Sequence, residues 1–165
     1  MQTQKKKKAN VNIDVNYNRK LIFKRNILKK IIVIIIEEIV LKEKKNFGCI
    51  NFLFCSDEEI LEYNKKYLSH NYYTDIITFY YPEKDYIDAD VLISMDSIIN
   101  NAKKYDVYYE SELFRVIIHG LLHLCGYEDK TMKQKLLMRK KENQYLKQFL
   151  KTQVSKDIYR LTYNF

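Results

Sequence analysis

The chain has 165 residues, of which 47% are apolar and 30% charged, so it can bury the core of one domain and is not a disordered chain. Its net charge is +8, and the whole excess lies between Lys130 and Arg160, where ten basic residues stand beside two acidic ones. The longest purely apolar run, Ile31–Ile36, is far shorter than the roughly 20 residues of a membrane-spanning helix, which excludes an ordinary transmembrane segment.

Strands are predicted where short runs rich in β-branched and aromatic residues alternate or form a compact apolar block. Helices are predicted where an apolar stripe recurs every three to four residues between charged positions. The expected order is strand Val11–Val15, helix Leu21–Lys45, strand Cys49–Cys55, helix Ser56–Leu68, strand Thr74–Tyr81, strand Ala89–Met95, helix Asp96–Tyr105, helix Glu112–Cys125 and helix Lys130–Leu150.

Several boundaries carry their own signals. Gly48 is predicted to stop the first long helix, and Gly126 the helix that ends at Cys125. Ser56 is the expected N-cap of its helix, with Glu59 at the capping-box position three residues later. The helix Glu112–Cys125 is apolar nearly all round, which predicts that it lies at the centre of the core.

The alternation of strands and helices predicts an α+β fold, with a small mixed sheet of about four strands covered by about five helices. No linker or internal repeat divides the sequence, so we expect residues 1–165 to form a single domain, with residues 1–10 as a flexible basic N-terminus. The metal site argued below is expected on the central buried helix.

Two of the three histidines, His119 and His123, lie four residues apart on that helix. Four residues make slightly more than one helical turn, so both rings leave the same face and can bind one metal ion. A single buried histidine is usually a satisfied core residue, but two such rings would each need a separate buried partner. The third histidine, His70, follows Ser69 in a polar turn and is expected to be exposed.

Asp129 stands ten residues after His119, beyond the turn expected at Gly126, and is the predicted third ligand. This spacing is that of the metzincin zinc proteases, in which a glutamate and a last histidine occupy the positions of Gly120 and Asp129. Glycine cannot act as the general base, which disfavours a protease. Glu128 competes with Asp129 as a ligand, and Asp129 has the alternative role of capping the last helix.

The sequence from His119 to Tyr127, HGLLHLCGY, resembles the HGxLHLxGY signature of the YbeY family. Tyr73–Phe79 looks like the PTDVLSF segment of that family, and Ala89–Ser94 like its GDIxIS strand. The similarity extends over roughly Val11–Leu150, with the segments in the same order.

The resemblance implies a metal-dependent, single-strand-specific endoribonuclease that matures the 3′ end of 16S rRNA and acts in ribosome quality control, with one zinc ion per chain. Family members often have a third histidine where this chain has Asp129, and an arginine where it has Leu68. The nucleophile is either a water activated by the metal or the 2′-OH of the RNA. The other functions considered are a zinc protease or related metallohydrolase, and a non-catalytic ribosome-assembly factor with a structural metal.

The basic segment Lys130–Leu150 is the expected contact for RNA of the small ribosomal subunit, although a solvated lysine-rich face has about the same weight. Base stacking on Tyr80 and Tyr81 is a weaker hypothesis. Asp75 and Asp90 are expected to cap turns at strand ends, with support of the ligand histidines as the alternative. Neither a membrane nor a DNA partner is expected, and three cysteines without CxxC spacing favour the cytoplasm.

Overall fold

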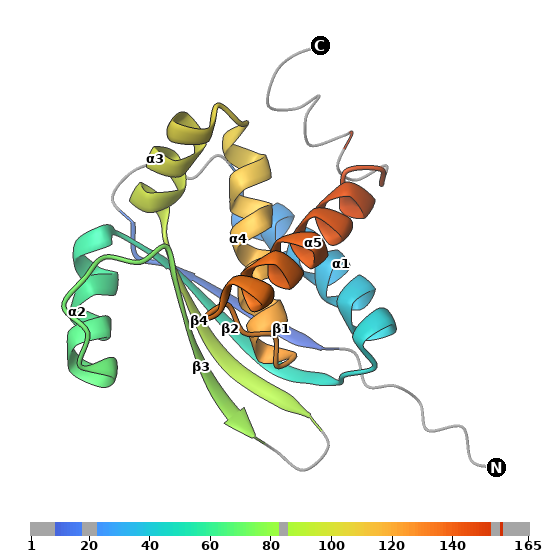
Figure 1. The fold of residues 1–165 in the computed structure, drawn as a ribbon, viewed down its shortest axis with the longest axis horizontal. Coiled ribbons are helices and arrows are strands. Elements are labelled where there is room, and N and C mark those ends of the chain that lie inside the picture. Colours follow the sequence, from blue (N-terminus) through green and yellow to red (C-terminus); the bar gives the residue numbers. More distant parts are fainter. Residues whose placement is uncertain (1–8, 18–22, 83–85, 153–155, 157–165) are drawn as a thin grey trace.

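The structure is a computed structural model that describes residues 9–17, 23–82, 86–152 and 156 (Figure 1). Four strands and five helices form an α+β fold over these residues, as the sequence predicts. Their bounds are β1 (Asn10–Val15), α1 (Arg25–Glu43), β2 (Phe47–Cys55), α2 (Asp57–Leu68), β3 (Ile76–Pro82), β4 (Ile87–Ser94), α3 (Met95–Tyr105), α4 (Tyr109–Leu124) and α5 (Met132–Phe149).

The four strands form one mixed sheet in the order β1-β2-β4-β3. β1 and β4 both run parallel to the central strand β2, whereas β3 pairs antiparallel with β4 at the edge. The parallel pairs need helical crossovers, which α1 and α2 supply, while β3 and β4 follow each other directly. The sheet is therefore mixed because it combines two crossovers with one hairpin.

One face of the sheet is covered by α1 and α4, with α5 packed across these two helices, and α2 lies on the other face (Figure 1). The main core lies in the first of these layers and includes the aliphatic face of α1 and almost the whole of α4. Phe114 of α4 stacks on Phe23 and meets Phe149 of α5 edge to face. The prediction that α4 is the central helix is confirmed, so its two histidines are held by a rigid element.

The sequence placed the end of the first long helix too late. α1 begins at Arg25 and ends at Glu43, and Lys44 follows as a left-handed C-cap with φ of 53°. Gly48 lies inside β2, next to an irregularity in its pairing with β4, so it does not stop the helix. The predicted start at Leu21 falls outside the described residues, and Phe23 is not helical.

The other two predicted boundaries are confirmed. Ser56 accepts a hydrogen bond from the Glu59 amide and caps α2, although the Glu59 carboxylate accepts from Asn16. Gly126 ends α4 with φ of 97°, and the amides of Gly126 and Tyr127 donate back to the carbonyls of His123 and Leu122. This is the Schellman pattern, which reverses the chain after a helix.

A ladder of polar side chains crosses all four strands on the face that carries α2. The amide of Asn12 donates to Asn51, Asn51 donates to one oxygen of Asp90, and Tyr81 donates to the other. Asp90 therefore lies in the middle of β4, opposite Phe79. Both roles expected for Asp90 were wrong, because it neither caps a turn nor approaches the histidines.

Among the helices that the structure describes, none combines the length and the apolar character that a bilayer crossing needs. The three cysteines are all free thiols, as their spacing predicts. Cys55 is fully buried, and burial raises the pKa of its thiol to about 12, with nearby carboxylates adding to the shift. Such a thiol is a packing residue at neutral pH.

Candidate metal centre

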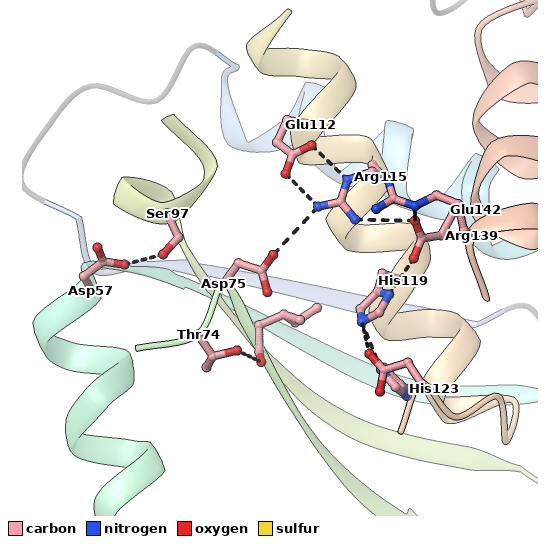
Figure 2. A network of polar contacts seen from close by, with 12 residues as sticks. Asp57, Thr74, Asp75, Ser97, Glu112, Arg115, His119, His123, Arg139 and Glu142 are labelled. Carbon is pink, nitrogen blue, oxygen red and sulfur yellow. Dashed lines mark hydrogen bonds and ion pairs between the residues drawn. The ribbon is translucent and has the colours of Figure 1, made fainter. Parts of the chain in front are cut away.

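α4 brings the two predicted histidines together on the side that faces α5 and β3. The Nε2 atoms of His119 and His123 lie 2.9 Å apart, with the ring planes perpendicular. Figure 2 shows both side chains leaving the helix in the same direction, His123 one turn beyond His119. The spacing of four residues therefore has the consequence expected from helix geometry.

The turn at Gly126 returns the chain so that Asp129 lies beside the two rings. One Asp129 carboxylate oxygen is 3.8 Å from Nε2 of His119 and 4.0 Å from Nε2 of His123. The three possible ligand atoms all lie within 4.8 Å of one another. Glu128 instead turns outward and pairs with Lys130 at 2.9 Å. The geometry thus favours Asp129 over Glu128 as the third ligand.

Each histidine is held at its Nδ1 atom by an acceptor. His119 Nδ1 lies 2.7 Å from a Glu142 carboxylate oxygen, and His123 Nδ1 lies 2.8 Å from the Tyr127 carbonyl. Because these oxygens only accept hydrogen bonds, both rings carry their proton on Nδ1 and leave Nε2 with a free lone pair. Burial, followed by the neighbouring His119, lowers the pKa of His123 and favours the neutral ring.

This donor set fits a divalent ion. Two neutral imidazoles with lone pairs on Nε2 atoms 2.9 Å apart repel each other unless a cation lies beside them. Zinc bonds of about 2.0–2.1 Å in a tetrahedral site place ligand atoms about 3.3–3.4 Å apart. The three separations seen here, from 2.9 to 4.0 Å, lie on both sides of that value. The residues present therefore match a site with three protein ligands.

Behind His119 lies a buried network of charged residues (Figure 2). Glu142 of α5 reaches His119, and the guanidinium of Arg115 reaches Glu142 at 3.4 Å. Arg115 also binds both oxygens of Glu112, at 2.6 and 2.8 Å, and approaches Asp75 at 3.8 Å. Burial raises the pKa of Glu142, but the hydrogen bond to His119 and the nearby positive charges outweigh burial. The net effect is a pKa below the ordinary value, so the carboxyl is ionised at neutral pH.

A second network holds the turn that follows His123. Glu43, at the end of α1, accepts hydrogen bonds from the hydroxyl of Tyr127 at 2.7 Å, from the hydroxyl of Tyr145 and from the ammonium of Lys141 at 2.8 Å. Burial raises the pKa of Glu43, but these three donors together lower it. Since the Tyr127 carbonyl orients His123, Glu43 fixes that ring through one intermediate residue.

The two histidines and Asp129 line an open cleft of about 680 Å³ between α2, β3 and α4. His70 lies in this cleft, exposed as predicted, with its ring stacked on Tyr72. Leu68, where the resemblance implies an arginine, is also in the lining. Asp75 belongs to the same wall, and burial raises the pKa of its carboxyl although Arg115 and His119 oppose the shift. Its carboxylate faces Arg115 and caps no turn.

Gly120 has a packing role that explains why no glutamate stands there. A Cβ at this position would lie 2.4 Å from the end of the Ile76 side chain and 3.4 Å from Thr78. The Ile76 side chain of β3 therefore packs directly on Gly120, and a larger residue there would require that side chain to move. The position of the protease base holds a glycine packed under Ile76, so no carboxylate is available there for the metzincin mechanism.

Sequence reasoning missed Glu142 and Arg115. Each had a signal in the sequence. Glu142 is the one acidic residue of Lys130–Leu150, and it falls at helical spacing in the buried stripe formed with Met138, Tyr145 and Phe149. Arg115 is similarly the only arginine or lysine of α4, one turn before His119. A charged residue at a buried position needs a partner, and here the partners lead to His119, one of the candidate metal ligands.

Asp129→Asn separates a ligand from a helix cap. Thr131 caps α5 by accepting from the amide of Gln134, so the capping role considered for Asp129 was wrong. We expect Asp129→Asn to weaken zinc binding by more than about tenfold, because an amide is a poorer ligand than a carboxylate. Glu128→Gln is the matched control and should leave the affinity unchanged. Competition with a zinc-binding dye measures both, and the reverse pattern would move the ligand to Glu128.

Comparison with known proteins places this site in a family. The family model described as Endoribonuclease YbeY matches residues 12–150, which include every residue of the site. Proteins of that name are 51% identical in Bacteroides thetaiotaomicron, over 62% of this chain and 74% of the relative, and 50% identical in Porphyromonas gingivalis, over 67% and 74%.

A solved structure agrees with the fold. The solution structure of TM1509 from Thermotoga maritima has a TM-score of 0.58 and 28% sequence identity to this chain, and covers 85% of this chain and 89% of its own. The resemblance seen in the motif around His119 is thereby confirmed, since the matched region contains both that motif and the strands β3 and β4. The chain belongs to the YbeY family.

Proposed function

We propose that this protein is a metal-dependent endoribonuclease that cuts single-stranded RNA, with one zinc ion held by His119, His123 and Asp129. The observation that carries the proposal is the pair of Nε2 lone pairs beside the Asp129 carboxylate, both rings being fixed from behind at Nδ1. Relatives named as endoribonucleases, at about half identity, supply the class of reaction.

The chemistry follows from an open coordination position. When bound, a divalent ion supplies Lewis acidity to a water molecule and to the scissile phosphate. The protein's own part is to direct both Nε2 atoms into the site, through the Glu142 carboxylate and the Tyr127 carbonyl, and to place the Asp129 carboxylate beside them. Three protein ligands rather than four also argue against a purely structural metal.

A zinc protease and a metal-dependent endoribonuclease could both use this ligand spacing, but they differ in the catalytic base that they need. A zinc protease needs a carboxylate base at position 120, where Ile76 fills the space. An RNA phosphodiester carries an internal nucleophile in its 2′-OH, and hydroxide on a bound metal ion could accept its proton, so cleavage does not require a carboxylate at position 120. The protease and the assembly factor therefore rank behind the endoribonuclease.

A direct comparison of substrates tests the proposal. We expect the zinc-loaded protein to cut a single-stranded RNA oligonucleotide internally and to leave casein intact. Chelation should abolish cleavage and added zinc restore it, while binding of RNA should weaken steeply as salt rises. Gel analysis of labelled RNA, with casein in parallel, measures this. Chelator-sensitive cleavage of casein with intact RNA would overturn the proposal.

For the cellular role we propose maturation of the 3′ end of 16S rRNA on the small ribosomal subunit, in the cytoplasm. The family and the basic α5 support this, because the exposed side of that helix carries Lys133, Lys135, Arg139 and Lys140. Mapping of RNA ends in cells depleted of the protein tests it. Unprocessed 3′ ends are expected, and normally matured ends would contradict the role.

A further inference from the structure

The metal site lies where two clefts meet. The first is the cleft of about 680 Å³ described above, on the side of α2. The second, of about 470 Å³, extends the other way toward the end of α1 and the start of β4. His123 and Thr78 line both clefts, so the two clefts adjoin at the site. An enzyme that cuts inside a strand needs such a path, since the strand continues on both sides of the broken bond.

The second cleft has the composition of a site for nucleic acid. Lys44 and Lys45, both exposed, form one wall, and Tyr80 and Tyr86 form the other. Tyr80 leaves β3 on the side of the site with 51% of its surface exposed, so its ring is free to contact a bound molecule. Within the described part of the chain, this lining includes two lysines and no carboxylate.

The walls of this cleft are fixed in place. The amide of Ile87, at the start of β4, donates to the carbonyl of Asn46 at 2.8 Å and ties the basic loop to the hairpin. On the other side, Glu43 immediately precedes the loop and holds the hydroxyl of Tyr127. The loop with the two lysines is therefore joined both to the hairpin and to the turn that leads to Asp129.

We propose that this cleft binds the nucleotides on one side of the scissile bond. This proposal rests on the endoribonuclease function proposed above. Lys44 and Lys45 neutralise backbone phosphates, and Tyr80 stacks a base. These two lysines and Tyr80 together recognise a flexible single strand, because a base that stacks on a tyrosine must be free of its pairing partner. Every base can stack in this way, since each has an aromatic face. The chemistry is tolerant of sequence and sensitive to salt.

The test uses the full-length zinc protein, a labelled single-stranded RNA with one cleavage site, and two shorter RNAs truncated on either side of that site. Lys44→Ala/Lys45→Ala should lower the slope of log affinity against log salt by about 1.4, which is two phosphates at about 0.7 each. Tyr80→Ala should reduce kcat/KM by about 5- to 150-fold, and Tyr80→Phe should retain it, because phenylalanine stacks equally well.

The matched control is Lys29→Ala/Lys30→Ala, which removes the same charge from exposed positions of α1 about 20 Å away along the helix. Its salt slope and cleavage rate should equal those of the wild type. The truncated RNAs localise the effect. The loss in the Lys44/Lys45 and Tyr80 variants should persist with one short RNA and vanish with the other, which lacks the nucleotides that occupy this cleft.

The two proposals fail in different ways. If the wild type leaves every RNA intact, the endoribonuclease function is wrong, and this subsite falls with it. If the wild type cleaves RNA but the Lys44/Lys45 variant keeps its salt slope and Tyr80→Ala its rate, only the subsite is wrong. Equal losses with both truncated RNAs would also contradict it, because a local contact cannot weaken substrates that do not reach it.

Discussion

Replacing His119 and His123 together by alanine is expected to abolish both metal binding and RNA cleavage. Removing a residue that merely supports a ligand typically lowers metal affinity about 10- to 100-fold, so the loss of two ligands should exceed that range. Elemental analysis of the purified protein measures the metal content, which should fall from about one ion per chain to background. The fold should survive, since both rings are partly exposed.

A separate variant shows that such a loss is specific. His70 lies in the same cleft, but the structure gives its Nδ1 a hydrogen bond to Tyr72 rather than a place among the ligands. His70→Ala should therefore retain the metal. Full metal occupancy in the double variant, or equal loss in His70→Ala, would show that the ion, if any, is bound elsewhere.

The sequence predicts the ligand set because its determinants are local. The spacing of His119 and His123 is a property of any helix, and Gly126 marks a turn that only a residue without a side chain adopts easily. Asp129 follows by counting along the chain. The order of the strands and helices was predictable for the same reason, since each element has its own periodicity.

The groups that hold the ligands come from distant parts of the chain, and periodicity does not reveal them. Glu142 is 23 residues from His119, and Glu43 is 84 residues from Tyr127. Their pairing depends on how α1, α4 and α5 cross, which no local pattern encodes. Asp90 was misplaced because a polar residue inside a strand suggests an end, whereas here it joins a ladder across a sheet face that is only partly covered.

Arg115 is the residue of the buried network whose loss should affect stability most. Its side chain is 18% exposed and neutralises Glu112 and Glu142, which are only 3% and 4% exposed. The hydrogen bonds that Arg115 donates to Glu112 outweigh the effect of burial and raise the pKa of Arg115, so the guanidinium stays charged at every pH of interest. Removing it leaves two carboxylates buried in the core without their main counter-charge.

Arg115→Met, which keeps most of the side-chain volume, is expected to lower the free energy of unfolding by about 3–5 kcal/mol at pH 7. The pKa of Glu142 lies below its ordinary value of 4.5, so its ionised form stabilises the fold above that value, and this contribution is lost as pH falls through the lowered pKa. The gap between wild type and variant should therefore narrow toward pH 4, where the Glu142 carboxyl of the variant becomes protonated and no longer needs the arginine. Urea unfolding with a chelator present, from pH 7 to pH 4, measures this.

Arg139→Met is the control: Arg139 is 64% exposed and 4.0 Å from Glu142, and its loss should cost at most about 1 kcal/mol. A gap that stays constant with pH would show that Arg115 stabilises the protein by packing alone.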